Sequence, residues 1–208
     1  MRWQTLQAVA ARVLESAIAE SLPCVIDADG MWSVLRQPEL VRGSRWTVLT
    51  PNKPEYARLR AALGQDGQEG GAGAQTEEQA AVELARALGG PVLVRKGETD
   101  LVSDGERLLP NTEQGCPKRS GGQGDVLAGT IATLLSWSKA ADAAGRLPAE
   151  APAAPLLAAY TGCLLTRRFS AAAFAKQRRA MTAPDLIEAI GPVFEEFSPA
   201  DGVMEGEG

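Results

Sequence analysis

The chain has 208 residues, of which 45% are hydrophobic and 5% aromatic, a balance that favours one globular domain of helices packed on a sheet over an aromatic-rich β-sandwich. Its formal net charge of −5 argues against nucleic acid or an anionic membrane as the main partner. It contains no histidine, which excludes histidine-dependent triads and imidazole metal sites, and its three cysteines are spaced too irregularly for a disulfide framework or a zinc site.

Membrane and targeting signals are also missing from the sequence. No apolar run reaches the length of a bilayer-spanning helix, and the first residues lack the apolar core of a signal peptide. We therefore expect a cytoplasmic protein with reduced thiols, and a mitochondrial location stays open for a longer form.

The first half of the chain alternates between helical and strand patterns. Strand–helix–strand alternation at this spacing is typical of parallel βαβ units. A glycine-rich, polar segment at 64–75 predicts a flexible loop. The predicted elements are a helix over about 3–20, a strand over 24–26, a short helix over 33–41, a strand over 46–50, a helix that begins at 51–55, a helix over 76–88 and a strand over 91–95.

The second half begins with two predicted strands in succession, without a helix between them. Two short apolar runs flank Asp104-Gly105, a strong hairpin signal. Three helices are then expected, with a loose Ala- and Pro-rich excursion between the first two and a flexible tail from residue 198. The predicted elements are hairpin strands at 100–103 and 106–109, helices over 126–137 and 156–169, the excursion at 139–155, and a last helix capped by Thr182.

A glycine cluster stands immediately before the helix predicted at 126–137. Gly121, Gly122 and Gly124 could let backbone N–H groups converge on phosphate oxygens, and the helix N-terminus adds positive charge. Asp125 would repel phosphate, but it suits a base that takes a proton from a hydroxyl attacking a γ-phosphoryl group. The alternative is a plain glycine turn with an acidic residue that favours the helix dipole.

Four segments in order resemble the ATP-dependent NAD(P)H-hydrate dehydratases, a ribokinase-like family. The most discriminating is residues 115–129, which contains Gly121-Gly122-Gln123-Gly124-Asp125. The other three are residues 25–32, 49–59 and 96–100. The resemblance extends to about residue 197 and implies a ribokinase-like three-layer α/β/α fold with a mostly parallel sheet, in a domain over 1–197 followed by a tail over 198–208.

This resemblance also implies an activity. Family members use ATP to phosphorylate the ring hydroxyl of hydrated NADH or NADPH, and loss of the phosphate then restores the double bond. ATP and Mg²⁺ are the implied cofactors, the hydrated dinucleotide is the implied substrate, and no protein metal ligand is expected. A vitamin-alcohol kinase of the same superfamily stays open as a rival.

Roles carry over from the family residue by residue. Asp125 is the implied catalytic residue and faces the substrate hydroxyl. Substrate contacts would come from Asn52, Lys53, Pro54, Glu55, Tyr56, Ala57, Arg58 and Asp125. ATP contacts would come from Lys96, Gly97, Glu98, Thr99, Asp100, Gly115, Cys116, Pro117, Lys118, Arg119, Ser120, Gly121, Gly122, Gln123 and Gly124.

Several of these residues also have plainer interpretations. Asn52 could only cap its helix, and Lys118-Arg119 could simply be exposed. Asp27 and Asp29 resemble a metal pair, but an Asp-Gly turn after a strand is more often structural.

The start of the chain leaves a further alternative. Residues 1–20 do not resemble the family's N-terminal region, so we expect an N-terminally truncated domain with an uncovered sheet edge or face. Such an edge would favour pairing with a second copy in a homo-oligomer. The alternative to an active enzyme is a truncated, inactive ATP-binding or interaction fragment.

Overall fold

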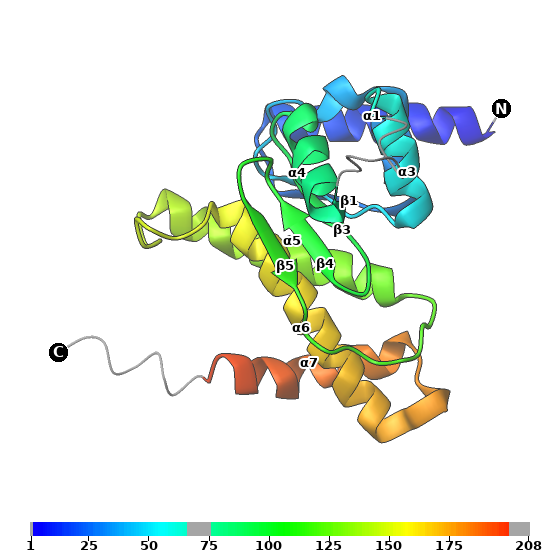
Figure 1. Ribbon diagram of the computed structural model, residues 1–208, viewed down its shortest axis with the longest axis vertical. Coiled ribbons are helices and arrows are strands. Elements are labelled where there is room, and N and C mark those ends of the chain that lie inside the picture. The colour runs from blue at the N-terminus through cyan, green and yellow to red at the C-terminus, as the bar shows by residue number, and fades with distance from the viewer. Residues whose placement is uncertain (1, 66–75, 200–208) are drawn as a thin grey trace.

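A computed structural model describes residues 2–65 and 76–199 of the chain. Within these ranges five strands form one sheet in the order β1-β2-β3-β4-β5 (Figure 1). The strands are β1 (Cys24–Ile26), β2 (Thr47–Leu49), β3 (Val92–Arg95), β4 (Asp100–Ser103) and β5 (Leu108–Asn111). The first three pair in parallel and the last two pair antiparallel, which confirms the predicted βαβ units and the hairpin.

One face of the sheet is covered by helices from the first half of the chain. Their apolar side chains, such as Leu14, Leu59 and Leu84, pack with Leu49 and Leu93 of the sheet. The covering elements are α1 (Arg2–Ala19), the 3₁₀ helix η1 (Ala28–Gly30), α2 (Met31–Arg36), the 3₁₀ helix η2 (Pro38–Val41), α3 (Lys53–Ala62) and α4 (Glu77–Leu88).

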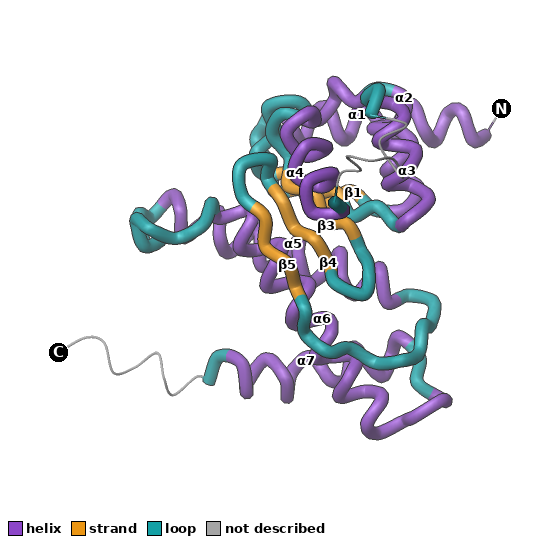
Figure 2. Tube along the Cα trace, in the orientation of Figure 1, coloured by secondary structure: helices purple, strands orange, loops and turns teal. Residues whose placement is uncertain are grey.

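The opposite face is covered by α5 (Gln123–Ala143) and α6 (Ala154–Gln177), as Figure 2 shows. Leu127, Ile131 and Cys163 pack there against Val48 and Val94. The last elements, η3 (Arg178–Ala180) and α7 (Ala183–Phe197), pack on α6 instead of on the sheet. The predicted three-layer α/β/α architecture is therefore confirmed.

Some predicted boundaries were wrong, for local reasons. The second hairpin strand begins at Leu108 instead of Glu106, because the Asp104 side chain accepts hydrogen bonds from the backbone N–H groups of Glu106 and Arg107 and widens the turn. The helix expected over 33–41 is split into α2 and η2 at Pro38, which cannot continue the helical hydrogen bonding.

Two later helices are longer than predicted. Helix α5 runs through Ala143, so the first part of the predicted excursion at 139–155 is helical, as suits its alanine content. Helix α6 extends from Ala154 to Gln177 instead of 156–169. The predicted loop at 64–75 and tail from 198 fall mostly outside the described residues. Among the residues that are described, no helix is long and apolar enough to cross a membrane.

Candidate functional site

The N-terminus of α5 is built on a glycine that no other residue could replace without strain. Gly122 is the N-cap and has φ 88°, in the left-handed region. A Cβ on this residue would lie 2.7 Å from the Cβ of Ala183, at the start of α7. The free backbone N–H groups of the first turn give this end of the helix a partial positive charge. The glycine turn and the helix end on which the predicted anion site depends are therefore observed, and anion binding there stays a prediction.

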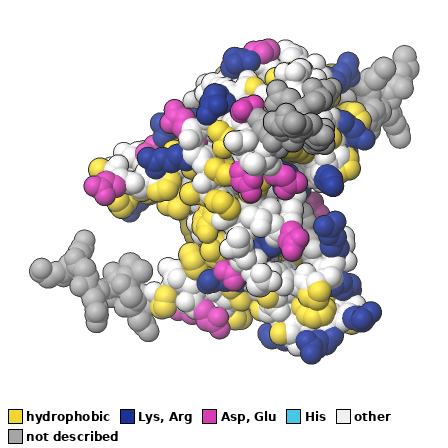
Figure 3. All heavy atoms as spheres, in the orientation of Figure 1, with side chains coloured by type: hydrophobic (Ala, Val, Ile, Leu, Met, Phe, Trp, Pro, Cys, Tyr) yellow, Lys and Arg dark blue, Asp and Glu magenta, His cyan; other side chains and the backbone are white. Residues whose placement is uncertain are grey.

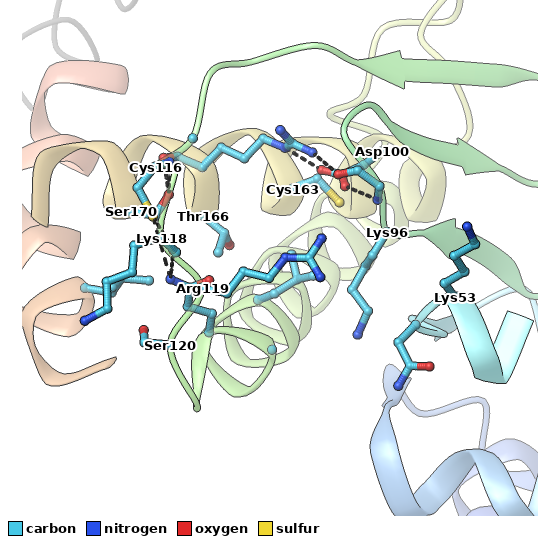
Figure 4. Close-up of a pocket in the computed structure, with 18 residues that line it drawn as sticks. Lys53, Lys96, Asp100, Cys116, Lys118, Arg119, Ser120, Cys163, Thr166 and Ser170 are labelled. Carbon is cyan, nitrogen blue, oxygen red and sulfur yellow. Dashed lines mark hydrogen bonds and ion pairs between the residues drawn. The ribbon is translucent and has the colours of Figure 1, made fainter. Parts of the chain in front are cut away.

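A pocket of about 410 Å³ opens beside this helix end (Figure 4). It lies outside the carboxyl ends of the parallel strands, where ligands of open α/β sheets bind. Figure 4 shows Lys53 and Lys96 toward one side of it, and Cys116, Lys118, Arg119 and Ser120 toward the other. The predicted residues that line it are Asn52, Lys53, Lys96, Gly97, Asp100, Gly115, Cys116, Lys118, Arg119, Ser120, Gln123 and Gly124.

Other predicted residues lie outside this pocket. Glu98 and Thr99 border a separate hollow with Arg95 and Glu77. Among the predicted substrate residues, Tyr56 is buried in the core, and Arg58 is exposed with its guanidinium 5.4 Å from the ring centre of Trp32. The remaining predicted residues absent from the pocket lining are Pro54, Glu55, Ala57, Pro117, Gly121, Gly122 and Asp125.

Asn52 has a structural role whatever its part in binding. Its side chain accepts a hydrogen bond from the Glu55 backbone N–H at 3.0 Å, and the Glu55 carboxylate accepts one from the Asn52 N–H at 2.9 Å. This reciprocal capping box confirms the predicted N-cap of α3. Because Asn52 also lines the pocket, the cap fixes the backbone at the pocket edge.

Lys96 is held at the pocket by the carboxylate of Asp27, the residue that follows the non-neighbouring strand β1. Its Nζ lies 2.9 Å from Oδ1 of Asp27, although β1 and β3 are separated by β2. The other Asp27 oxygen lies 3.3 Å from the position that a Cβ on Gly124 would take. The ion pair therefore stands beside the first turn of α5, where Lys96 can meet an anion bound at the helix end.

The metal interpretation of Asp27 and Asp29 has little support in this geometry. Asp27 already pairs with Lys96. In the described ranges, no group of three or more Cys, Asp and Glu side chains could hold a metal ion.

Sequence reasoning missed the residue that organises the loop after β3. Arg167 of α6 lines the pocket and forms a 2.6 Å ion pair with Asp100, which is buried. The hydrogen bond to Asp100 raises the pKa of Arg167 above its ordinary value. Its presence in an otherwise apolar helical stretch was a usable signal, because a buried arginine requires a partner.

The segment from Gly115 to Gly124 is organised largely by its own contacts. The carbonyl of Lys118 accepts hydrogen bonds from the Cys116 thiol at 2.8 Å and from the Gln123 amide at 3.2 Å. The Lys118 ammonium donates to the carbonyls of Arg179 and Met181, both at 2.6 Å. These bonds tie the segment to the basic turn between α6 and α7, which lies at the lower right of Figure 3.

Asp125 belongs to a second cavity. This groove of about 830 Å³ runs between α5 and α7, and Gly122 and Asp125 lie at one end of it. Its other walls are mainly apolar and include Leu134, Trp137 and Phe194. Gly124 lines the pocket and Asp125 lines the groove, so the first turn of α5 contributes residues to both cavities.

Comparison with known proteins identifies the family. The model of the NAD(P)H-hydrate dehydratase family matches residues 5–192. The chain is 40% identical over 188 residues to the ATP-dependent (S)-NAD(P)H-hydrate dehydratase of Bos taurus, covering 90% of this chain and 55% of that protein. It is 38% identical over 185 residues to the Homo sapiens protein of the same name, covering 89% and 51%. The chain thus spans about half the length of these relatives.

Solved structures agree on the fold. A ribokinase-like superfamily protein from Enterococcus faecalis matches with a TM-score of 0.61 at 18% identity, covering 90% of this chain and 58% of that one. A protein from Streptococcus mutans matches with a TM-score of 0.57 at 17% identity, covering 91% and 71%. The fold is therefore ribokinase-like. This fold agrees with the match of the family model over residues 5–192, which shows that the chain belongs to the NAD(P)H-hydrate dehydratase family.

Proposed function

We propose that this chain takes part in the ATP-dependent dehydration of hydrated NADH or NADPH. The observation that carries the proposal is the glycine-built N-terminus of α5, with Lys96 on its pocket side and Asp125 on its groove side. A phosphate-binding helix end and a carboxylate base would then share one helical turn. The names of the relatives point to the same reaction.

The reaction needs two steps. In the first, the substrate ring hydroxyl attacks the γ-phosphorus of ATP, the bond to the β-phosphate oxygen breaks, ADP leaves, and the Asp125 carboxylate takes the hydroxyl proton. In the second, the new phosphate ester leaves as inorganic phosphate while the neighbouring ring carbon loses a proton, which forms the double bond. The products are the repaired dinucleotide, ADP and phosphate.

The residues around the pocket would divide the binding. The α5 N-terminus and the ammonium of Lys96 would offset the charge of the ATP phosphates. Lys118 and Arg119 could add positive charge on the opposite wall. Asn52 and Lys53 stand at the edge nearest α3 and would contact the hydrated dinucleotide.

Magnesium belongs to this proposal as a partner of ATP. Mg²⁺ commonly bridges phosphate oxygens with one or two carboxylates and several waters. Because Asp27 is already engaged by Lys96, the ion would be held mainly by ATP and water. It would supply charge neutralisation at the transferred phosphoryl group.

The test is incubation of the protein with hydrated NADH, ATP and Mg²⁺, with NADH, ADP and inorganic phosphate measured together. Equal amounts of all three support the proposal. ADP with a stable phosphorylated product and no free phosphate would indicate the kinase alternative. ATP binding without any product would indicate a binding fragment.

A further inference from the structure

We propose that Arg167 is a positioning residue that fixes both backbone segments of the nucleotide pocket before ATP arrives. The inference rests on the proposed function in taking ATP as the ligand. It assigns no contact between Arg167 and the nucleotide.

Arg167 reaches three acceptors on different segments. Its Nε donates to Oδ2 of Asp100 at 2.6 Å, and its two terminal nitrogens donate to the carbonyls of Gly97 at 2.9 Å and Glu113 at 3.1 Å. Gly97 follows β3 and Glu113 follows β5, so one planar guanidinium links α6 to both loops that leave the sheet toward the pocket. Arginine can do this because its five N–H donors point in fixed directions.

Gly97 is the point at which this arrangement acts on the pocket. Its N–H donates to Oδ1 of Asp100 at 3.1 Å, and its carbonyl accepts from Arg167, so the Asp100–Arg167 pair engages both backbone polar groups. A Cβ on Gly97 would lie 2.8 Å from the Thr99 carbonyl oxygen, so the turn has no room for a side chain at this position. Lys96 precedes this residue and therefore leaves the sheet in a fixed direction.

Asp100 is itself anchored by a second partner. The amide of Asn111 donates to its Oδ2 at 3.2 Å from the neighbouring strand β5, and both residues are buried. The inference therefore gives Asp100, a predicted ATP contact, a role that acts through Gly97.

The same turn of α6 holds the second loop. The hydroxyl of Ser170 accepts a hydrogen bond from the Cys116 N–H at 3.2 Å and donates to the Arg167 carbonyl at 2.8 Å. A Cβ on Gly115 would lie 3.3 Å from that hydroxyl and 3.6 Å from Cγ of Arg167. Both walls of the pocket are therefore tied to residues 167–170 of one helix. Loops fixed in this way lose less conformational entropy when a ligand binds.

The neighbouring arginine offers a matched control. Arg168 pairs with the carboxylate of Glu113 at 3.1 Å, but its side chain is 43% exposed, against 19% for Arg167. It is absent from the pocket lining and bonds neither Gly97 nor Asp100 in the described structure. Both arginines contact Glu113, but only Arg167 also bonds Gly97 and Asp100, while their residue type and helix are the same.

The experiment compares Arg167→Lys with Arg168→Lys in the full chain, with ATP affinity and amide hydrogen exchange as readouts. Lysine keeps the charge beside Asp100 but cannot bond three separated acceptors. We expect Arg167→Lys to raise the Kd for ATP about tenfold, which corresponds to the loss of about one charge-assisted hydrogen bond. We also expect faster exchange at the Gly97 and Cys116 amides without ligand, and saturating ATP should restore most of kcat. Arg168→Lys should change none of these quantities.

Ser170→Ala serves as the second variant, because it leaves the Arg167–Asp100 ion pair intact and removes the hydroxyl that bonds the Cys116 N–H and the Arg167 carbonyl. We expect it to weaken ATP binding a few-fold and to speed exchange at Cys116 alone. If both variants exchange and bind ATP as the parent does, or if Arg168→Lys loses as much affinity as Arg167→Lys, the positioning role is wrong. If the parent does not bind ATP, the proposed function fails separately, and the exchange rates at Gly97 and Cys116 still decide the positioning role.

Discussion

The first turn of α5 lines two cavities, and they are built in opposite ways. The pocket of about 410 Å³ is lined mostly by polar and charged residues, and its loops are bonded to Arg167 and Ser170 of α6. The groove of about 830 Å³ is mainly apolar and lies between the side chains of α5, α6 and α7. The pocket therefore has its hydrogen-bonding geometry set in advance, whereas the groove offers shape and two exposed carboxylates, of which Asp125 lies in the first turn of α5 and Glu195 lies in α7.

This difference suggests that affinity for ATP and chemistry on the second substrate depend on separate residues. The proposed phosphate site depends on backbone conformation, which several tertiary contacts maintain. The proposed base depends on the position of a single side chain at the mouth of the other cavity. Variants that affect one cavity should therefore leave the other largely intact, and four predictions test this.

The largest effect is expected for Asp125→Asn. Loss of a general base typically lowers turnover by a factor of ~10² to 10⁴. ATP affinity should stay near that of the parent, because Asp125 lines the groove and not the pocket. Single-turnover kinetics with calorimetry of ATP binding would measure both quantities. Turnover within a few-fold of the parent would end the base assignment.

Gly122→Val should instead act on the proposed phosphate site through the start of α5, although Gly122 itself lines the groove. A β-branched residue is strained at φ 88°, and its Cβ would meet Ala183 at 2.7 Å, so we expect a loss of about 2 kcal/mol or more in stability and at least tenfold weaker ATP binding. The control is Gly121→Val, since a Cβ on Gly121 meets nothing within 4 Å and its φ is not in the strained range. Equal melting temperatures for the two variants would contradict this account of the helix start.

A smaller effect on activity and stability is expected for substitution of Asn52, which lines the pocket where α3 begins. Asn52→Ala should lose the helix cap, worth about 1 kcal/mol, and raise the KM for hydrated NADH a few-fold. Asn52→Asp retains a capping side chain, so it should recover the melting temperature without recovering KM. If Asn52→Asp has the KM of the parent, Asn52 acts as a cap alone.

The smallest effect concerns thiol labelling. Cys116 lines the pocket and is half-buried, so ATP should slow its alkylation a few-fold. Cys163 is fully buried, and burial raises the pKa of its thiol well above its ordinary value, so it should stay unlabelled in the folded chain. Mass spectrometry of the alkylated peptides with and without ATP would measure both. Protection of Cys116 by an apolar groove ligand, and not by ATP, would reverse the assignment of the two cavities.

Much of this arrangement was predictable because it depends on local sequence. Asn52 with Glu55 and Thr76 with Gln79 form the capping boxes that begin α3 and α4, and both patterns depend on residues three positions apart. Asp104-Gly105 predicted the hairpin for the same reason. The glycine cluster predicted the start of the next helix to within a few residues, because glycine readily adopts the positive φ that the N-cap of this helix requires.

What the sequence by itself determined is the set of elements, the three-layer fold and the segments that meet at the candidate site. The tertiary structure alone decided which neighbour each polar group took. Lys96 is paired with Asp27 across an intervening strand, and Arg167 bonds Gly97 from a helix 70 residues later in the chain. Such pairings depend on how the helix layers pack on the sheet. A local sequence pattern does not predict which segments far apart in the sequence will contact each other. The sequence also did not predict that Gly124 and Asp125 line different cavities. They are adjacent in the chain, but successive residues of a helix point in different directions.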